Sequence, residues 1–225
     1  YEKNSRKPKV SAVSLSEDLK RRDFTVNAMA VKISDLNFKK TGKKTIIGFA
    51  KKSVIDFYGG QKDLKEKILC TPLDADITFS EDPLRMMRAV RFASQLNFAI
   101  DLKTLQAIHR NRERLKIISA ERIKEELFKL LSTPAPSVGL VLMFQTGLLD
   151  LVLPEVTALD GVEEIFGHNH KNNLVHTFKV VDNIAQRNKK TLLRLAGLLH
   201  DIGKSGTKKF IKGTGWTFHA HEHLG

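Results

Sequence analysis

From Glu81 onward the sequence favours α-helices, and this limits the fold to a largely helical one. Apolar residues recur there at three- and four-residue intervals, the spacing that places them on one face of a helix. The Thr133-Pro134 step ends a helix, because proline cannot continue one. The run Val138–Leu149 is almost continuously apolar and indicates a buried helix. We expect helices near residues 81–96, 102–114, 119–132, 135–147, 174–185 and 192–200.

The residues before Glu81 favour a smaller mixed region. Short strands are expected at 30–33 and 53–57, where β-branched residues gather. The lysine-rich stretch between them indicates a hairpin-like excursion or a loop. Gly59 and Gly60 then precede a helix over 61–68, and the pair suits either a hinge or an ordinary strand-to-helix turn. The expected fold class is therefore mostly α with a small α/β part.

The chain is strongly basic, which narrows the class of partner. Of 225 residues, 38 are Lys or Arg and 25 are Asp or Glu, a net charge of +13. This charge favours nucleic acid as a partner over an inert basic surface. The single cysteine, Cys70, excludes a disulfide framework and a cysteine-rich zinc site, and it suits a cytoplasmic protein. No stretch is long and apolar enough to span a membrane.

The segment Glu81–Phe92 is expected to open the first long helix, and it carries the most informative pair of side chains. Ser80 is a good N-cap, and Pro83 is tolerated in a first helical turn. Asp82 and Arg85 are three residues apart, so they would project from nearly the same helical face. A carboxylate accepts hydrogen bonds and a guanidinium donates them, so the pair offers an acceptor beside a donor.

That pairing matches the Watson–Crick edge of two bases only. Cytosine and adenine present an amino donor beside a ring-nitrogen acceptor, whereas uracil and guanine present a carbonyl beside a ring N–H. A fixed Asp82 and Arg85 would accept the first two bases and leave buried polar groups unpaired with the others. Arg88 and Arg91 continue the spacing and are candidates for phosphate contact or helix support. The alternative is an amphipathic helix with a solvated basic face.

A second polar group of residues lies within Arg21–Ala30. Asp23 and Asn27 are four residues apart, so their side chains would meet in a helical turn. An Asp beside an Asn can hold both hydroxyls of a ribose, and the neighbouring Arg22 can hold a phosphate. The competing interpretation is a helix start with ordinary surface charges.

A third group joins His176 to the pair His200-Asp201, on helices expected to face each other. Imidazole nitrogens and a carboxylate brought together can bind a divalent metal that activates water. His219 and His221 are either ligands of a second metal or loop residues. The alternative to a metal ligand is, for each of these histidines, a core histidine that binds no metal.

These groups resemble, in the same order, the motifs of one enzyme family. Glu81–Arg85 resembles the EDxxR motif, and Arg21–Asn27 the RRDFxxN motif, of bacterial class II tRNA nucleotidyltransferases (CCA-adding enzymes) and poly(A) polymerases. Asp56–Leu64 is similar to the family's block between head and neck, and Arg122–Leu127 to its next block, R-x-x-x-E-L. Leu198–Lys204 resembles the HD phosphohydrolase signature.

The resemblance implies three regions. Residues 1–72 would form the end of a nucleotidyltransferase head with its linker, 73–157 a helical neck that selects the nucleotide and binds RNA, and 158–225 the start of an HD domain. Arg122 and Glu126, four residues apart, are expected to brace the helix that reads the base, with direct substrate contact as the alternative. The implied nucleotide-binding residues are Arg22, Asp23, Asn27, Asp82, Arg85, Arg88 and Arg91. The implied ligands of the HD metal are His176, His200 and Asp201.

In this family a D-x-D block holds two Mg²⁺ ions and precedes the RRDFxxN motif. Residues 1–20 contain no such block, and we expect it upstream of Tyr1. A further aspartate of the HD site, which would hold a transition metal, is expected downstream of Gly225. By itself the 225-residue chain is therefore expected not to transfer nucleotides.

The implied activity is template-independent transfer of CMP and AMP from CTP and ATP to the 3′ end of tRNA. The basic surface would bind the acceptor arm of the tRNA. Three alternatives remain open: a poly(A) polymerase or an enzyme that adds only CC or only A, a metal-dependent HD phosphohydrolase acting on nucleotides or RNA ends, and a non-catalytic RNA-binding protein.

Overall fold

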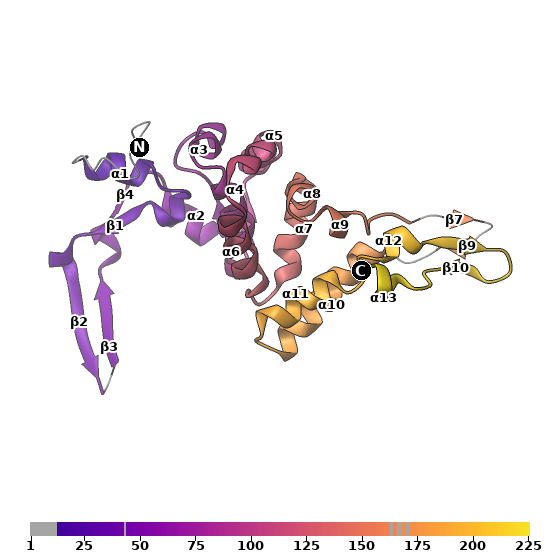
Figure 1. Ribbon diagram of the computed structural model, residues 1–225. Coiled ribbons are helices and arrows are strands. Elements are labelled where there is room, and N and C mark those ends of the chain that lie inside the picture. Colours follow the sequence, from indigo (N-terminus) through magenta and orange to yellow (C-terminus); the bar gives the residue numbers. More distant parts are fainter. Residues whose placement is uncertain (1–12, 43, 163, 166–167, 170–171) are drawn as a thin grey trace.

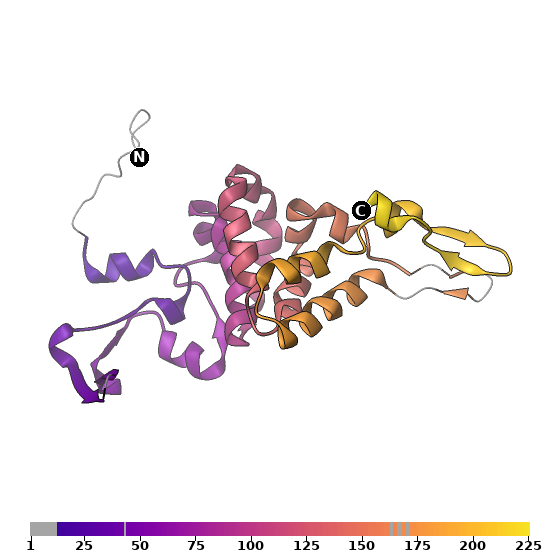
Figure 2. The same ribbon diagram turned by 60° about the horizontal axis from the view of Figure 1, so that its bottom comes forward.

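The computed structural model describes residues 13–42, 44–162, 164–165, 168–169 and 172–225. Figure 1 shows an elongated arrangement with helices in the middle, and Figure 2 agrees that the β2–β3 and β9–β10 hairpins lie at opposite ends. Within these ranges every sheet has two strands, and none of the helices is both long enough and apolar enough for a membrane crossing. The prediction of a mostly helical fold with a small mixed part is confirmed.

The first region contains two strand pairs between short helices. β1 (Met29–Val31) pairs antiparallel with β4 (Val54–Asp56). Between them, β2 (Leu36–Thr41) and β3 (Lys44–Phe49) form the expected hairpin. The helices are α1 (Leu15–Lys20), the 3₁₀ turn η1 (Thr25–Asn27) and α2 (Gly60–Glu66).

The turn from β4 into α2 is fixed by backbone contacts. Asp56 accepts hydrogen bonds from the N–H groups of Gly60 and Gln61, both at 2.8 Å. Burial alone would raise the pKa of Asp56, but the backbone donors outweigh it and hold the pKa below its ordinary value. A Cβ on Gly60 would collide with the carbonyl oxygen of Thr25. These contacts describe a capped strand-to-helix turn.

The helix expected over 81–96 is interrupted at Asp82, so that prediction was partly wrong. α3 (Ala75–Glu81) ends before this residue, and α4 (Leu84–Leu96) begins after Pro83. Asp82 is extended, with φ −141° and ψ 97°, because a proline disfavours helical angles in the residue before it. Ser80 therefore lies inside α3 and is not an N-cap. Asp82 stands in a kink and does not share a helical face with Arg85.

α4 occupies the centre of the hydrophobic core. Met86, Met87 and Val90 are fully buried, and the helix packs against α6 (Ala120–Leu131) and α7 (Pro136–Thr146). The helices expected at 102–114, 119–132 and 135–147 are confirmed, except that the first ends early. The remaining elements here are β5 (Ile68–Leu69), β6 (Ala99–Ile100), α5 (Leu102–Asn111), the 3₁₀ segment η4 (Arg112–Ile117), α8 (Leu148–Val152) and α9 (Pro154–Thr157).

The last region contains two helices that pack on each other, α10 (Asn173–Arg187) and α11 (Thr191–Leu199), both as expected. Arg194, which is 5% exposed, donates hydrogen bonds to the carbonyl oxygens of Leu131 at 2.6 Å and Thr133 at 2.8 Å. This cation at the end of α6 fastens α11 to the preceding helices. The other elements are β7 (Glu164–Ile165), β8 (His168–Asn169), α12 (Lys204–Thr207), β9 (Lys209–Ile211), β10 (Gly215–Thr217) and α13 (His221–Leu224).

Candidate functional site

A polar cleft of about 500 Å³ lies where the residues after α1, the kink between α3 and α4, and the start of α6 meet. Its lining consists of Arg21, Arg22, Asp23, Asn27, Asp82, Leu84, Arg85, Arg88 and Arg122. Every predicted nucleotide-binding residue except Arg91 is in this list. Segments about 60 residues apart in sequence therefore form one cavity.

A larger cavity of about 600 Å³ lies beside β1 and β4, but its lining is mainly apolar. None of the described residues around it is a carboxylate or a histidine. The smaller cleft is the better candidate for chemistry, because it combines carboxylates with arginines.

Asp23 is the best-anchored carboxylate of the cleft. It is 7% exposed, and its Oδ1 accepts a hydrogen bond from Asn27 Nδ2 at 3.1 Å. Its Oδ2 accepts one from Arg88 Nε at 2.7 Å. The expected convergence of Asp23 and Asn27 is thus present, and Arg88 adds a cation from α4. Arg22 lies at the rim, where its guanidinium contacts Asp18 at 2.9 Å.

Arg85 is held in place by backbone acceptors from two segments. Its Nη2 donates to the carbonyl oxygen of Arg21 at 2.7 Å, and its Nη1 donates to that of Thr78 at 3.2 Å. Glu81 adds a weaker contact at 3.3 Å. The contribution of Arg21 comes from its main chain, which no side-chain pattern in the sequence could have indicated.

Asp82 reaches the cleft from the kink. Its Oδ1 accepts a hydrogen bond from the N–H of Leu84 at 3.2 Å, and its Oδ2 lies 3.5 Å from Arg122 Nη2. Asp82 and Arg85 thus line the same cavity although they leave the backbone from different elements. Arg122 is expected as a brace, with direct substrate contact as the alternative, and it lines the cleft.

Arg91 points away from the cleft into the helix bundle. It is 8% exposed, and its Nε donates to Glu126 Oε2 at 2.6 Å. Burial would raise the pKa of Glu126, but hydrogen bonds from Lys129 and Arg91 outweigh it and keep the pKa below the ordinary value. Of the two roles considered for Arg91, its contacts indicate helix support. The expected Arg122–Glu126 brace is replaced by an Arg91–Glu126 pair between α4 and α6.

The sequence has one Asp-x-Asp pattern, Asp74-Ala75-Asp76, and both of its carboxylates have structural partners. Asp74 caps α3 by accepting a hydrogen bond from the N–H of Asp76 at 2.9 Å. Asp76 accepts a hydrogen bond from Arg110 at 2.6 Å, which lowers the pKa of this carboxyl. Neither residue lines the cleft.

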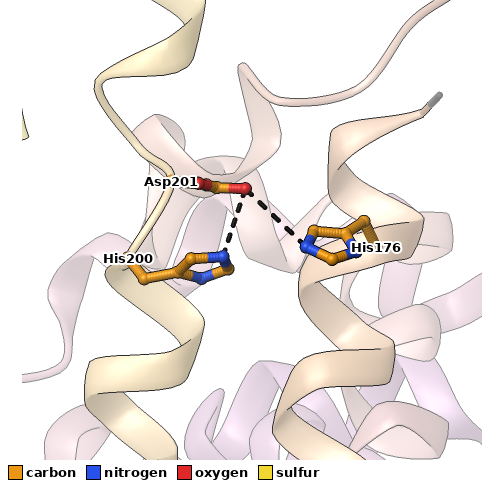
Figure 3. Close-up of side chains that lie close together, drawn as sticks. All are labelled: His176, His200 and Asp201. Carbon is orange, nitrogen blue, oxygen red and sulfur yellow. Dashed lines mark ion pairs between the residues drawn. The ribbon is translucent and has the colours of Figure 1, made fainter. Parts of the chain in front are cut away.

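A second candidate site lies at the start of the last region. Figure 3 shows His176 of α10 and His200 at the end of α11 on either side of the Asp201 carboxylate. Asp201 Oδ2 lies 3.2 Å from His200 Nε2 and 4.0 Å from His176 Nε2. Ligand atoms of the three residues all lie within 4.8 Å of one another. The structure thus brings together the three residues predicted to hold a metal.

Backbone contacts orient His200 of this cluster and the neighbouring His221. His200 Nδ1 lies 2.8 Å from the carbonyl oxygen of Gly197, and His221 Nδ1 lies 2.8 Å from that of Phe218. A carbonyl only accepts, so Nδ1 of each ring carries a hydrogen, which leaves Nε2 as the ring atom that could bind a metal. Both Nε2 atoms face Asp201, at 3.2 Å and 3.7 Å. Converging imidazole nitrogens and a carboxylate fit a divalent transition metal. His219 and His223 are exposed.

Three family models match the chain in sequence order. The Poly A polymerase head domain matches residues 1–70, and the probable RNA and SrmB-binding site of polymerase A matches residues 97–159. The HD domain matches residues 172–225. The predicted boundaries at 72 and 157 stay a prediction.

Known proteins resemble the chain over most of its length. It is 34% identical to the A-adding tRNA nucleotidyltransferase of Deinococcus radiodurans over 94% of this chain and 46% of the relative. It is 35% identical to the Multifunctional CCA protein of Vibrio parahaemolyticus over 95% of this chain and 48% of the relative. The crystal structure of the Bacillus stearothermophilus CCA-adding enzyme in complex with CTP aligns with a TM-score of 0.52 and 42% identity, over 61% of this chain and 30% of that one. The chain spans about half the length of the curated relatives it matches.

Proposed function

Because this chain belongs to the class II family of CCA-adding enzymes and poly(A) polymerases, we propose that its protein adds nucleotides to the 3′ end of tRNA. The observation that carries the proposal is the polar cleft, where Asp82 and Arg85 lie with Asp23 and Asn27. An acceptor and a donor for a base, next to a carboxylate and an amide for a ribose, suit one ribonucleotide. The names of the relatives support tRNA as the acceptor.

In this proposal Asp82 and Arg85 select the base. Asp82 accepts a hydrogen bond from the amino group of cytosine or adenine, and Arg85 donates one to the adjacent ring nitrogen. The backbone contacts of Arg85 to Arg21 and Thr78 support this role, because they restrict the guanidinium before a nucleotide arrives. Uracil and guanine would place a carbonyl against Asp82, which leaves both acceptors without a donor.

Asp23 and Asn27 hold the ribose hydroxyls, with Arg88 fixing the Asp23 carboxylate. Arg22 and Arg122 lie at the same cavity and would neutralise phosphate charge. The basic exterior would hold the tRNA acceptor arm by its phosphates, so that binding weakens as salt rises.

The reaction joins the tRNA 3′-oxygen to the α-phosphorus of the nucleotide, breaks the bond to the β-phosphate oxygen and releases pyrophosphate. Mg²⁺, when bound, supplies charge neutralisation at the phosphates. We propose that its carboxylate ligands come from the segment expected upstream of Tyr1, since Asp74 and Asp76 are engaged elsewhere. The 225 residues alone would then bind nucleotides without transferring them, and addition by this chain alone would contradict that assignment.

The test uses the protein with its natural upstream segment. It receives tRNA lacking the terminal CCA, Mg²⁺, and each nucleotide alone or all four together, and the products are sequenced. Ordered addition of C, C and A with U and G refused supports CCA addition. Addition of A alone, or of C alone, would make it an A-adding or poly(A) enzyme or a CC-adding one. No addition in any mixture would overturn the proposal.

A second activity is proposed on the strength of the cluster of His176, His200 and Asp201. The ligand atoms of these three residues converge, which supports a metal-dependent hydrolysis of phosphate esters, at nucleotides or RNA ends. The metal, when bound there, supplies an activated water. His200→Ala and Asp201→Ala should abolish hydrolysis and leave nucleotide addition unchanged. Hydrolysis that survives both substitutions would contradict the assignment.

A further inference from the structure

Asp201 has four basic neighbours although its side chain is only 3% exposed. Three of them are the ring nitrogens of His176, His200 and His221. The fourth is the ammonium group of Lys204, whose Nζ lies 2.7 Å from Oδ2. Lys204 is therefore the closest neighbour of this buried carboxylate.

Lys204 and a metal would require the same atom. His176 and His200 both face Oδ2 of Asp201, so a metal bound by them would use this oxygen. Lys204 already donates a hydrogen bond to it. Two cations crowded onto one oxygen repel each other strongly in a buried setting. Binding of a metal therefore requires that the ammonium group leave Asp201.

Lys204 has room to leave. Its side chain is 20% exposed, which places it at the border between the buried carboxylate and solvent. Its four-carbon stem is flexible, and the freed ammonium has three donors. A phosphate group at the metal would offer it a new anionic partner.

We propose that Lys204 is a displaceable counter-cation of this site, which holds Asp201 until a divalent metal takes the carboxylate and then binds a phosphate group beside the metal. This inference rests on the proposed metal-dependent activity of the cluster. It deepens that activity, because it makes metal and phosphate binding mutually dependent. Each would raise the affinity for the other by the same factor.

The experiment measures Mn²⁺ binding to the full protein by the EPR signal of free Mn²⁺, without phosphate and with inorganic phosphate. For Lys204→Met we expect Mn²⁺ to bind about tenfold more tightly than to the wild type, because the ammonium that repels the metal is gone. Phosphate should tighten Mn²⁺ binding to the wild type by about fivefold or more and should tighten it clearly less in this variant. Lys204→Arg keeps the charge and should bind Mn²⁺ as weakly as the wild type. Lys212→Met, at an exposed lysine of the β9–β10 turn, is the matched control.

Thermal unfolding supplies a second readout of the same variants. Without metal, Lys204→Met leaves a buried carboxylate without its ammonium partner, so its Tm should fall below that of the wild type. Mn²⁺ should restore it, with a larger rise in Tm than in the wild type.

The possible failures are distinct. If the wild type binds Mn²⁺ and Lys204→Met binds it equally or more weakly, the counter-cation role is wrong and the metal site stands. If phosphate tightens Mn²⁺ binding equally in both proteins, the phosphate role of Lys204 is wrong. If neither protein binds Mn²⁺ more tightly than His200→Ala does, the metal site itself is wrong and the inference falls with it.

Discussion

The guanidinium of Arg88 and the carboxylate of Asp23 lie 2.7 Å apart, Nε to Oδ2, and connect the head segment to α4 across the cleft. Asp23 also accepts a hydrogen bond from Asn27. One carboxylate thus serves both the proposed ribose site and the junction between two regions of the chain. Its orientation depends on a cation 65 residues away in sequence.

Arg88→Ala should therefore weaken nucleotide addition without changing the choice of base. Loss of the Asp23 contact leaves the ribose site poorly oriented. We therefore expect kcat/KM to fall about tenfold for CTP and ATP alike, which corresponds to a loss of ~1.4 kcal/mol in transition-state stabilisation. Steady-state kinetics with each nucleotide measures this. Lys116→Ala, which breaks an exposed ion pair with Glu113, is the control. A loss confined to one nucleotide would show that Arg88 acts on the base instead.

Glu126→Gln should destabilise the protein, because Arg91 would lose its carboxylate inside the helix bundle. Side-chain exposures of 9% for Arg91 and 3% for Glu126 place the pair in the core. Breaking such a pair from one side costs about 3 kcal/mol. Denaturant unfolding measures the loss, with Glu113→Gln at an exposed ion pair as control. Equal stability of the two variants would contradict a bracing role.

The same pair makes stability depend on pH at the acid end. The pKa of Glu126 is lower in the folded protein than its ordinary value, so its ionised form stabilises the fold. That contribution is fully present above about pH 4.5 and is lost as the pH falls through the lowered pKa. The Tm of the wild type should drop more steeply below this pH than that of Glu126→Gln. Parallel curves would mean that another carboxyl controls the acid transition.

Arg194→Met should loosen the attachment of α11 to the end of α6. The guanidinium donates to Leu131 and Thr133, and methionine would leave these carbonyl oxygens without donors. We expect a loss of about 2–4 kcal/mol in the free energy of unfolding. Hydrogen exchange should show faster opening of α10 and α11. Arg187→Met, at an exposed arginine of α10, should change neither measurement.

Much of the fold was predictable because helical spacing and turn residues are local signals. Five of the six expected helices, the lysine-rich hairpin and the cluster of His176, His200 and Asp201 followed from such patterns. The kink at Asp82 did not follow, because a proline such as Pro83 suits the first turn of a helix as well as a break before it. The partner of Glu126 was also missed: Arg91 and Arg122 are both arginines on helical faces, and only tertiary packing decides which one reaches it.

The cleft itself could be predicted only in part. Side chains such as Asp23 and Asn27 could be paired from their spacing. The carbonyl oxygens of Arg21 and Thr78, which restrain Arg85, have no signature in the sequence, since every residue has the same group. Arg122 enters the cleft because α6 crosses near the kink, a relation between elements 40 residues apart in sequence.

The central claim is that Asp82 and Arg85 read the base, and its most direct test is binding of the four nucleoside triphosphates to wild type, Asp82→Ala and Arg85→Ala. Fluorescence or calorimetric titration gives Kd for each. The account predicts that the wild type binds CTP and ATP at least about tenfold more tightly than UTP and GTP, and that each substitution removes this preference. Equal binding of all four nucleotides to the wild type, or an unchanged preference in both variants, would contradict it.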